Sequence, residues 1–359
     1  FTYGGELAGQ PSMEDYGYDY WFATGNVARP DHKNPLNFFL NGEAMGKMEG
    51  FSAQIVATQF VKWMQETREA GEPFFVTIWF HEPHGPVNSD PRFVERYSEL
   101  DDPSLRQYYA NITQIDEAVA TVVAALKEAG VYDDTLIWYT SDNGPAGPHE
   151  FGTFNRSDSP YGRSRNRGST GGLRGRKRAT HEGGIRVPGI ISWPRGFEAA
   201  GVKPGTLSAE PIIGNDIFPT LLDAADVPIP GGITLDSQSI LPLLQGKPFE
   251  RAKPLYWRNS FGWRDDLTFE AALREGQWKL VSDSGRTQFE LYHIVRDPRE
   301  TTDLSAHDPE IFERMKAAFI AYDKDVLADL SGVAGTAQTE APTWYERDPR
   351  MEGKVPVEH

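Results

Sequence analysis

Two short polar segments each follow an apolar run of the chain. Residues 81–86 (HEPHGP) come directly after residues 74–80, and residues 141–145 (SDNGP) come directly after residues 135–140. Asp and Asn oxygens suit a hard cation such as Ca²⁺ or Mg²⁺, and a histidine can transfer a proton. Both segments also have simpler explanations, because Asp-Asn-Gly often forms a plain turn and a histidine after a strand is often only hydrogen-bonded.

A third candidate is a basic stretch. Residues 156–178 hold seven Arg and one Lys against the single Asp158, about +7, in a chain whose net charge is −16. Such a run can be solvated surface. It can also be an anion-binding loop, since its glycines let the backbone approach a ligand and Lys177 in a Gly-rich turn is a compact cation for a tetrahedral oxyanion. In that case Arg163, Arg165 and Arg167 are candidate substrate-binding residues.

The elements that position these segments follow from the apolar pattern. Residues 74–80, 135–140 and 189–193 predict strands covered on both faces. Residues 53–69 and 112–126 have the apolar spacing of amphipathic helices. Strands that alternate with helices indicate a parallel α/β sheet. Ligands bind at the carboxyl ends of such strands, so we expect the polar segments to share a site there.

The pattern changes near residue 241. Residues 278–282 and 289–293 predict short strands, and a helix is expected near residues 309–330, which together indicate a small α+β subdomain. The expected domains are an α/β domain at 1–250, the subdomain at 251–330 and an extended tail at 331–359.

Composition excludes several classes of protein. A net charge of −16 disfavours nonspecific nucleic-acid binding. The longest apolar runs are far shorter than the ~20 residues that span a bilayer, so we expect no transmembrane helix. The sequence has no cysteine, which excludes disulfides, thiolate metal sites and a cysteine nucleophile within it.

The order of these segments resembles the formylglycine-dependent sulfatases (type I sulfatases) of the alkaline-phosphatase-like superfamily, over roughly residues 16–325. The resemblance implies an α/β sandwich with a central, mainly parallel sheet flanked by helices, plus the C-terminal α+β subdomain. Six segments carry it: residues 17–22 (GYDYWF), 74–86, 139–144 (YTSDNG), 173–188 (LRGRKRATHEGGIRVP), 216–222 (DIFPTLL) and 279–304.

The resemblance also implies roles for single residues. Asp142 and Asn143 would be two ligands of a metal ion, expected to be Ca²⁺ rather than Mg²⁺. Lys177 would contact the sulfate, and His84 would bind a substrate oxygen or assist the leaving group. The family's nucleophile is a hydrated formylglycine, made from Cys or Ser in a Cys/Ser-x-Pro-x-Arg motif that this sequence lacks. The family's Asp-Asp metal element and its Gly-Lys-Trp-His element are lacking as well. We expect all three to belong to a segment before Phe1, and the chain by itself to be inactive.

The function implied is hydrolysis of sulfate esters. The basic stretch and nine Trp favour a sulfated carbohydrate over a small aryl sulfate. Two alternatives remain: a phosphomonoesterase or phosphonate-ester hydrolase of the same superfamily, and a catalytically dead sulfatase-like protein that binds anionic glycans. Family habit implies a periplasmic or secreted bacterial protein, although no signal-peptide pattern is visible. The partners expected are the sulfated substrate, with neither nucleic acid nor membrane.

Overall fold

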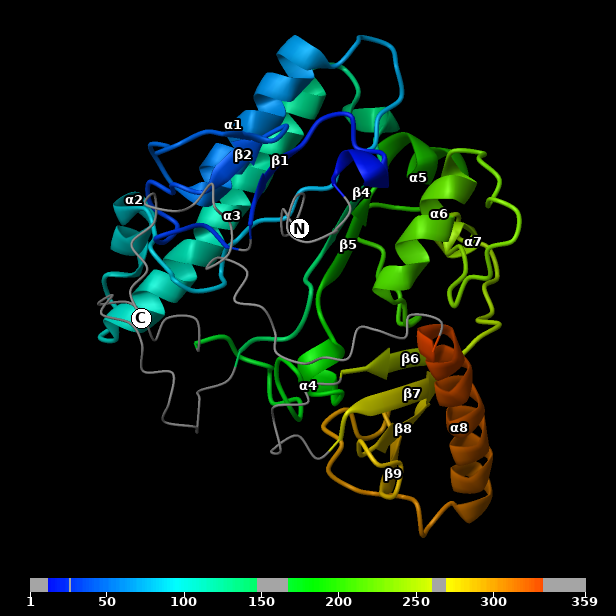
Figure 1. The fold of residues 1–359 in the computed structure, drawn as a ribbon. Coiled ribbons are helices and arrows are strands. Elements are labelled where there is room, and N and C mark those ends of the chain that lie inside the picture. The colour runs from blue at the N-terminus through cyan, green and yellow to red at the C-terminus, as the bar shows by residue number, and fades with distance from the viewer. Residues whose placement is uncertain (1–11, 26, 147–166, 260–268, 332–359) are drawn as a thin grey trace. The chain divides into compact units, whose positions relative to one another are not determined.

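The computed structural model describes residues 12–25, 27–146, 167–259 and 269–331, and these form two compact units (Figure 1). The described residues before Asp133, together with Ala146, Arg167 and Gly168, make up the first unit. Asp133–Pro145 and the described residues from Ser169 onward make up the second.

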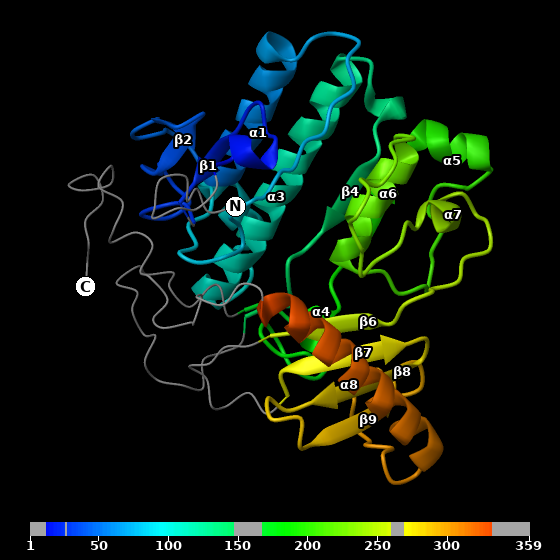
Figure 2. The ribbon, with the colours of Figure 1, turned by 45° about the vertical axis from the view of Figure 1, so that its right-hand side comes forward.

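Two helices form the centre of the first unit. Helix α1 (Ser52–Lys62) continues into a π-helical turn, η2 (Trp63–Thr67), and runs beside α3 (Pro103–Glu128) in both views (Figures 1 and 2). Three fully buried alanines, Ala53, Ala57 and Ala118, meet between them. Their short side chains let two helices approach closely. The helix predicted at 53–69 is thus confirmed.

Helix α3 begins nine residues before the apolar stripe that predicted it. Asp102 caps it, since the Asp102 carboxylate accepts hydrogen bonds from the backbone N–H of Ser104 (2.8 Å) and Leu105 (3.3 Å). Pro103 occupies the first helical position, where its missing N–H costs nothing. Periodicity alone does not detect this first turn, because Leu105 is its single large apolar residue.

The first unit also contains a three-stranded antiparallel sheet of β1 (Phe22–Thr24), β2 (Phe38–Leu40) and β3 (Glu43–Ala44). The Phe22 and Phe38 rings stack across it at 4.5 Å. Three short helices complete the described elements: η1 (Glu14–Tyr16), α2 (Pro91–Val94) and η3 (Glu95–Tyr97).

The strand predicted at residues 74–80 is not present in the structure. No strand is assigned there, and no other described segment pairs with it. The side chains alternate between half-buried and exposed, with Phe75 64% and Trp79 51% exposed. One face of this segment packs, while the other is open. Within the described residues of the first unit, this segment therefore lacks the expected cover on both faces.

The parallel pairing predicted for neighbouring strands is also wrong for the two strands that pair next to the Asp-Asn-Gly loop. In the second unit, β4 (Ile137–Thr140) and β5 (Gly189–Ser192) pair antiparallel, with Ile137 opposite Ser192 and Thr140 opposite Gly189. Parallel neighbours need a long crossover, usually a helix, that returns the chain to the starting end. The described part of the connection holds only the four-residue helix α4 (Glu182–Ile185). The chain re-enters at the end where β4 finished, so β5 runs back along it.

A four-stranded antiparallel sheet dominates the rest of the second unit, with strands in the order β6 (Leu255–Arg258), β7 (Ala271–Glu275), β8 (Trp278–Ser282) and β9 (Phe289–His293). Helix α8 (Pro309–Ser331) lies across one face of it (Figures 1 and 2). Met315 and Phe319 of α8 are fully buried against Leu273, Leu280 and Leu291. The predicted strands at 278–282 and 289–293 and the predicted final helix are confirmed.

The remaining elements of the second unit are short: η4 (Tyr132–Asp134), which begins in the first unit, α5 (Pro194–Ala200), η6 (Gly214–Asp216), α6 (Ile217–Ala224) and α7 (Leu241–Leu244). None of the helices in the described ranges is both long and apolar enough to cross a membrane.

Candidate active site

The Asp-Asn-Gly segment forms a loop directly after β4. Asp142 is exposed, and one of its carboxylate oxygens accepts a hydrogen bond from the Asn143 N–H at 2.8 Å. The Asn143 amide donates to the Gly144 carbonyl at 2.9 Å, and the Ser141 hydroxyl donates to the Asn143 carbonyl at 3.2 Å. These local bonds fix the backbone and leave the Asp142 carboxylate at the surface.

Glycines bring this loop against the segment that carries Lys177. The Gly144 N–H donates to the Gly184 carbonyl at 2.8 Å, and the Lys177 N–H donates to the Pro145 carbonyl at 3.0 Å. A Cβ at Gly144 would lie 1.9 Å from the Gly183 carbonyl oxygen. The two backbones can approach this closely only because no side chain separates them. The structure therefore brings Asp142, Asn143 and Lys177 onto adjoining loops of one unit.

Glycines also fold the Lys177 segment upon itself. The Gly183 N–H donates to the Arg174 carbonyl at 2.7 Å, and a Cβ at Gly183 would lie 2.2 Å from the Gly175 carbonyl oxygen. Gly175 has a φ of +76°, which favours glycine. The side chain of Lys177, half-buried, is carried on this closed loop.

The donors fit Ca²⁺ in kind but not in number. Asp142 and Asn143 can offer oxygen ligands, whereas Ca²⁺ takes six to eight. Nowhere in the described ranges do three or more His, Cys, Asp or Glu side chains gather so that they could hold a metal ion. Asp142 and Asn143 could therefore supply only part of a calcium shell, and the described residues contain no complete one.

His84 belongs to the first unit. It is exposed, and its Nδ1 lies 2.7 Å from the carbonyl oxygen of Gly85. The preceding Glu82 anchors this loop on the two central helices. One Glu82 oxygen accepts hydrogen bonds from the Ser52 hydroxyl (2.6 Å), the Ala53 N–H (2.9 Å) and the Gln114 amide (2.9 Å).

Buried titratable groups surround that anchor. Burial lowers the pKa of His81 to about 4, and its Nε2 lies 2.9 Å from the Thr24 hydroxyl. Burial also lowers the pKa of His32. For Glu82, burial alone would raise the pKa, but the nearby His32 and the Ser52 hydroxyl outweigh it and hold the pKa below its usual value. Glu82, His81 and His32 therefore form a buried group of titratable side chains next to His84.

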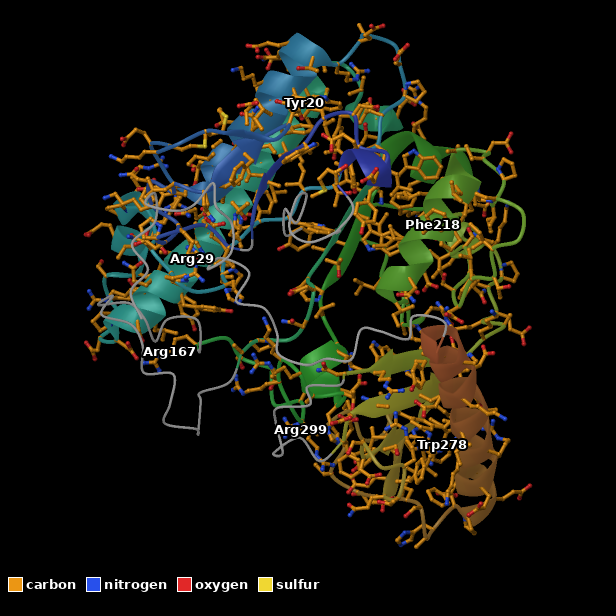
Figure 3. All side chains as sticks on the ribbon, in the orientation of Figure 1. Tyr20, Arg29, Arg167, Phe218, Trp278 and Arg299 are labelled. Atoms are coloured by element: carbon orange, nitrogen blue, oxygen red, sulfur yellow. The ribbon has the colours of Figure 1, made fainter. Side chains whose placement is uncertain are left out.

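The basic stretch is described only in part. Arg163 and Arg165 lie outside the described residues, whereas Arg167 lies within them (Figure 3). The Arg167 Nε donates to the Ser104 hydroxyl at 2.7 Å, and its guanidinium pairs with the Asp102 carboxylate. The charge of Arg167 is thus balanced by the acidic cap of α3.

Sequence analysis missed a buried charged cluster beside the Lys177 loop. The Lys279 ammonium on β8 lies 3.0 Å from a Glu182 oxygen and 2.9 Å from a Glu300 oxygen, and all three side chains are almost fully buried. The Glu182 N–H donates to the other Glu300 oxygen at 2.6 Å. We call Glu182, Lys279 and Glu300 the buried triad. Burial raises the pKa of Glu300 despite the neighbouring Lys279.

One signal for this cluster was present in the sequence. Lys279 stands inside the apolar strand pattern of residues 278–282, between Trp278 and Leu280. A buried lysine needs a carboxylate partner. The partners could not be identified, because Glu182 is 97 residues away in the chain.

Comparisons with solved structures show the fold. A crystal structure of Ps i-CgsB with k-i-k-neocarrahexaose matches 87% of this chain and 67% of its own, with a TM-score of 0.71 and 20% identity. Another, of a protein in complex with its substrate D-glucosamine-2-N,6-O-disulfate, matches 86% of this chain and 76% of its own, with a TM-score of 0.63 and 17% identity. These are structures of the alkaline-phosphatase-like sulfatase fold.

Sequence relatives agree. The chain is 26% identical over 335 residues to the Escherichia coli sulfatase YdeN, covering 84% of this chain and 55% of the relative. It is 28% identical over 278 residues to human arylsulfatase A, covering 70% of this chain and 49% of the relative. The chain thus spans about half the length of these relatives.

Family models give the assignment. Residues 175–323 match the model described as N-sulphoglucosamine sulphohydrolase, C-terminal. Residues 4–227, more than half of the chain, match the model described as Sulfatase. The protein therefore belongs to the sulfatase family.

Proposed function

We propose that this protein takes part in the hydrolysis of sulfate esters, with Lys177 as the cation that contacts the sulfate. The observation that carries the proposal is the glycine-mediated junction of the Asp142–Gly144 loop with the Lys177 loop. An ammonium beside oxygen ligands for a hard cation suits a tetrahedral oxyanion, because both would stabilise charge that develops on it. His84 is proposed to bind a substrate oxygen or assist the leaving group.

Asp142 and Asn143 are proposed as part of a Ca²⁺ shell that other ligands must complete. Because the described residues do not complete it, we derive no chemical step through the metal. Calcium is most plentiful outside the cytoplasm, which supports a periplasmic or secreted location. The nucleophile is proposed to be a formylglycine supplied by a Cys/Ser-x-Pro-x-Arg motif outside this sequence.

The proposed substrate class is sulfated carbohydrate. Support comes from the neighbours solved with a neocarrahexaose and with D-glucosamine-2-N,6-O-disulfate. The basic stretch also supports a polyanion, because clustered cations steer one toward them. The alternatives from the same superfamily are phosphomonoesters and phosphonate esters, whose oxyanions have a similar shape.

Binding and turnover of 4-nitrophenyl sulfate and 4-nitrophenyl phosphate by the chain itself separate these possibilities. The chain should bind the sulfate ester in competition with inorganic sulfate and should not hydrolyse it. Lys177→Ala should weaken that binding at least tenfold, about 1.4 kcal/mol, while exposed Lys203→Met should leave it unchanged. Tighter binding of the phosphate ester would favour the alternative. Hydrolysis by the chain alone would contradict the proposed external nucleophile.

The basic stretch has its own test. Replacing Arg163, Arg165 and Arg167 with Ser while keeping Lys177 should weaken binding of a sulfated polysaccharide at least tenfold at low ionic strength. The salt dependence of binding should fall with it, since salt screens charges over about 8–10 Å. Unchanged affinity and salt dependence would make the stretch a solvated surface and remove this support for a polysaccharide.

A further inference from the structure

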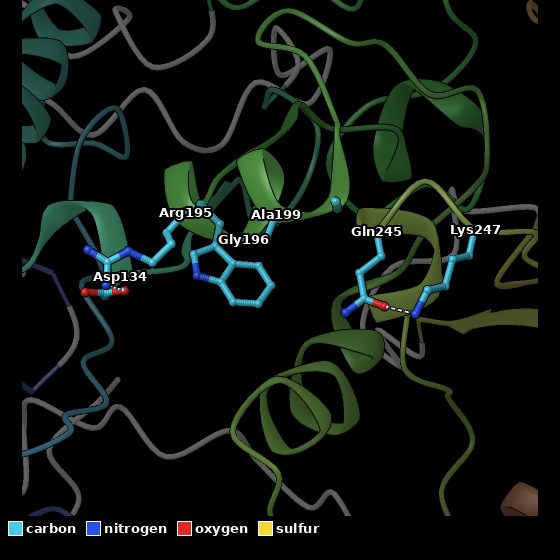
Figure 4. A pocket seen from close by; sticks show the side chains of 8 residues that line it. Asp134, Arg195, Gly196, Ala199, Gln245 and Lys247 are labelled. Carbon is cyan, nitrogen blue, oxygen red and sulfur yellow. Dashed lines mark hydrogen bonds and ion pairs between the residues drawn. The ribbon is translucent and has the colours of Figure 1, made fainter.

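A cavity lies away from the Asp142 loop. It has a volume of about 650 Å³ and lies wholly within the second unit. That volume is in the range of small-ligand sites. Eight residues line it: Asp134, Trp193, Arg195, Gly196, Ala199, Ala200, Gln245 and Lys247 (Figure 4).

Strand register places this cavity at the far end of the β4–β5 pair from the candidate active site. Asp142 follows the Thr140 end of β4, where Gly189 is opposite. Asp134 precedes the other end of β4, and Trp193 directly follows Ser192, which pairs with Ile137. The four-residue strands span about 10 Å at ~3.4 Å per residue. The cavity is therefore a separate site.

A glycine, Gly196, makes room for the Trp193 indole. A Cβ at Gly196 would lie 2.2 Å from the indole Cδ2, so only glycine leaves room for the ring. Gly196 lies inside helix α5 without a positive φ, and the backbone does not require glycine there. Alanine would favour the helix more. The lack of a side chain at Gly196 makes room for the indole. Ala199 and Ala200 on the same helix have small side chains and take up little space in the cavity.

Two polar walls accompany the indole. Arg195 pairs with Asp134 at 2.8 Å on one side, and the Lys247 ammonium donates to the Gln245 carbonyl oxygen at 2.6 Å on the other (Figure 4). The second wall is a fixed turn, because Gly246 (φ +67°) ends α7 and the Lys247 N–H donates to the Pro242 carbonyl at 2.9 Å. Arg195 and Lys247 against Asp134 give the lining a charge of +1 in a chain of −16.

We propose that this cavity binds an anionic hexose residue of a saccharide at a site separate from the candidate active site. The Trp193 face would stack on the sugar ring, since aromatic rings bury one apolar face well. Lys247 and Arg195 would neutralise a sulfate or carboxylate, and the Gln245 amide nitrogen would donate to a hydroxyl. A flat aromatic ligand is disfavoured because the wall formed by Gln245 and Lys247 is polar.

The test is a nuclear magnetic resonance titration that follows the Trp193 indole N–H, assigned from its loss in Trp193→Phe. The probes are a sulfated galactose hexasaccharide, its desulfated counterpart and an oligogalacturonate hexasaccharide. The sulfated probe should shift the Trp193 signal and bind at least tenfold more tightly than the desulfated one. The oligogalacturonate shows whether a carboxylate serves equally well.

Single substitutions test the contribution of each cavity residue to binding. Trp193→Ala should weaken binding of the sulfated probe at this site at least tenfold, while Phe218→Ala, which removes an exposed aromatic ring of α6, should not. Lys247→Met should abolish the preference for the sulfated probe, with Lys203→Met as its control. Gly196→Ala should act like Trp193→Ala, and a helical far-ultraviolet spectrum confirms that it folds.

The outcome is independent of the proposed function. In Lys177→Ala the Trp193 signal should still respond to the sulfated probe. Absence of any shift at saturating probe, or unchanged affinity in both Trp193→Ala and Lys247→Met, would overturn this inference. Binding that depends on Lys177 alone would overturn it too, and would leave the proposed sulfate contact standing.

Discussion

Lys177 and Glu182 lie five residues apart in one glycine-rich segment, yet their surroundings are opposite. Lys177 is half-buried and stands beside the exposed Asp142 loop. Glu182 is 2% exposed and faces the Lys279 ammonium at 3.0 Å. Both belong to the stretch that resembles the sulfatase signature, and only Glu182 is almost fully buried.

The contrast shows that the two charged residues of this segment meet different physical demands. Charges removed from water must be paired and hydrogen-bonded, or they cost several kcal/mol. The buried triad meets most of that demand within itself, with Arg186 3.9 Å from the second Glu182 oxygen. Its charges therefore hold α4 against β8. Lys177 is only half-buried, so it is not fully removed from water. The buried triad therefore helps to fix the backbone of the segment that also carries Lys177, the proposed sulfate contact.

The largest effect is expected from breaking the buried triad. Lys279→Met leaves the buried Glu300 without its cation and leaves Glu182 with only Arg186, whose Nη1 lies 3.9 Å from a Glu182 oxygen. It should lower the free energy of unfolding by about 3 to 5 kcal/mol, measured by urea denaturation. Lys203→Met, at an exposed lysine, should stay within about 0.5 kcal/mol of the wild type. Equal losses in both variants would contradict the structural role of the triad.

His181, next to Glu182, should make stability depend on pH. Burial lowers the pKa of His181 to about 3. In the unfolded chain His181 binds a proton as the pH falls through about 6.5, whereas in the folded chain it stays neutral until about pH 3. The contribution of His181 to stability is therefore fully present above about pH 6.5 and is lost as the pH drops toward 3. Between pH 7 and pH 4 the loss attributable to His181 should be about 3 kcal/mol at most, at 1.36 kcal/mol per unit of pKa.

The slope of unfolding free energy against pH measures this loss. His181→Gln should flatten the slope between pH 7 and pH 4, whatever its effect on absolute stability. The same change at the exposed His307 should leave the slope as it is. A steep slope that persists in His181→Gln would place the titrating group elsewhere, for example at His81.

The junction of the two loops can be broken with one methyl group. Gly144→Ala places a Cβ 1.9 Å from the Gly183 carbonyl oxygen, so the loops must separate. We expect a loss of about 1 to 3 kcal/mol in unfolding free energy and weaker binding of 4-nitrophenyl sulfate. Gly231→Ala, where nothing lies within 4 Å, is the matched control. Unchanged sulfate binding in Gly144→Ala would show that the junction does not position Lys177.

Arg167 should matter little to stability. Its side chain is 39% exposed and pairs with the similarly exposed Asp102, and exposed pairs of this kind contribute about 0 to 1 kcal/mol. A double-mutant cycle of Arg167→Ser with Asp102→Asn, which keeps a capping oxygen, measures the coupling. A coupling well above 1 kcal/mol would make Arg167 structural rather than a candidate for ligand steering.

The smallest effect is expected from calcium. Asp142 and Asn143 offer only part of a shell, so calorimetric titration of the chain should give a dissociation constant no tighter than about millimolar. At 1 mM Ca²⁺ this raises the unfolding free energy by no more than about 0.4 kcal/mol. Asp142→Asn should remove even that gain. Micromolar affinity would mean that this chain already holds a complete shell.

Sequence patterns predicted best where the information is local. The strands at 278–282 and 289–293 and the helix that begins at Pro309 agree with the structure, because alternation, helical spacing and a proline at the helix start are short-range features. The same patterns failed at residues 74–80, whose apolar composition suggested a strand buried on both faces. Composition does not say whether a neighbouring strand is there to pair with it.

The sequence by itself determined the chemistry that is available: the Asp-Asn-Gly loop, the Gly-rich segment around Lys177, and family membership through their order. Only the tertiary structure decided which charges are buried and which stay in contact with water. It set β5 antiparallel to β4, joined Glu182 to Lys279 and Glu300 across the chain, and seated the Trp193 indole over Gly196. These outcomes depend on contacts between distant residues, and desolvation acts on a charge only once such contacts have removed its water.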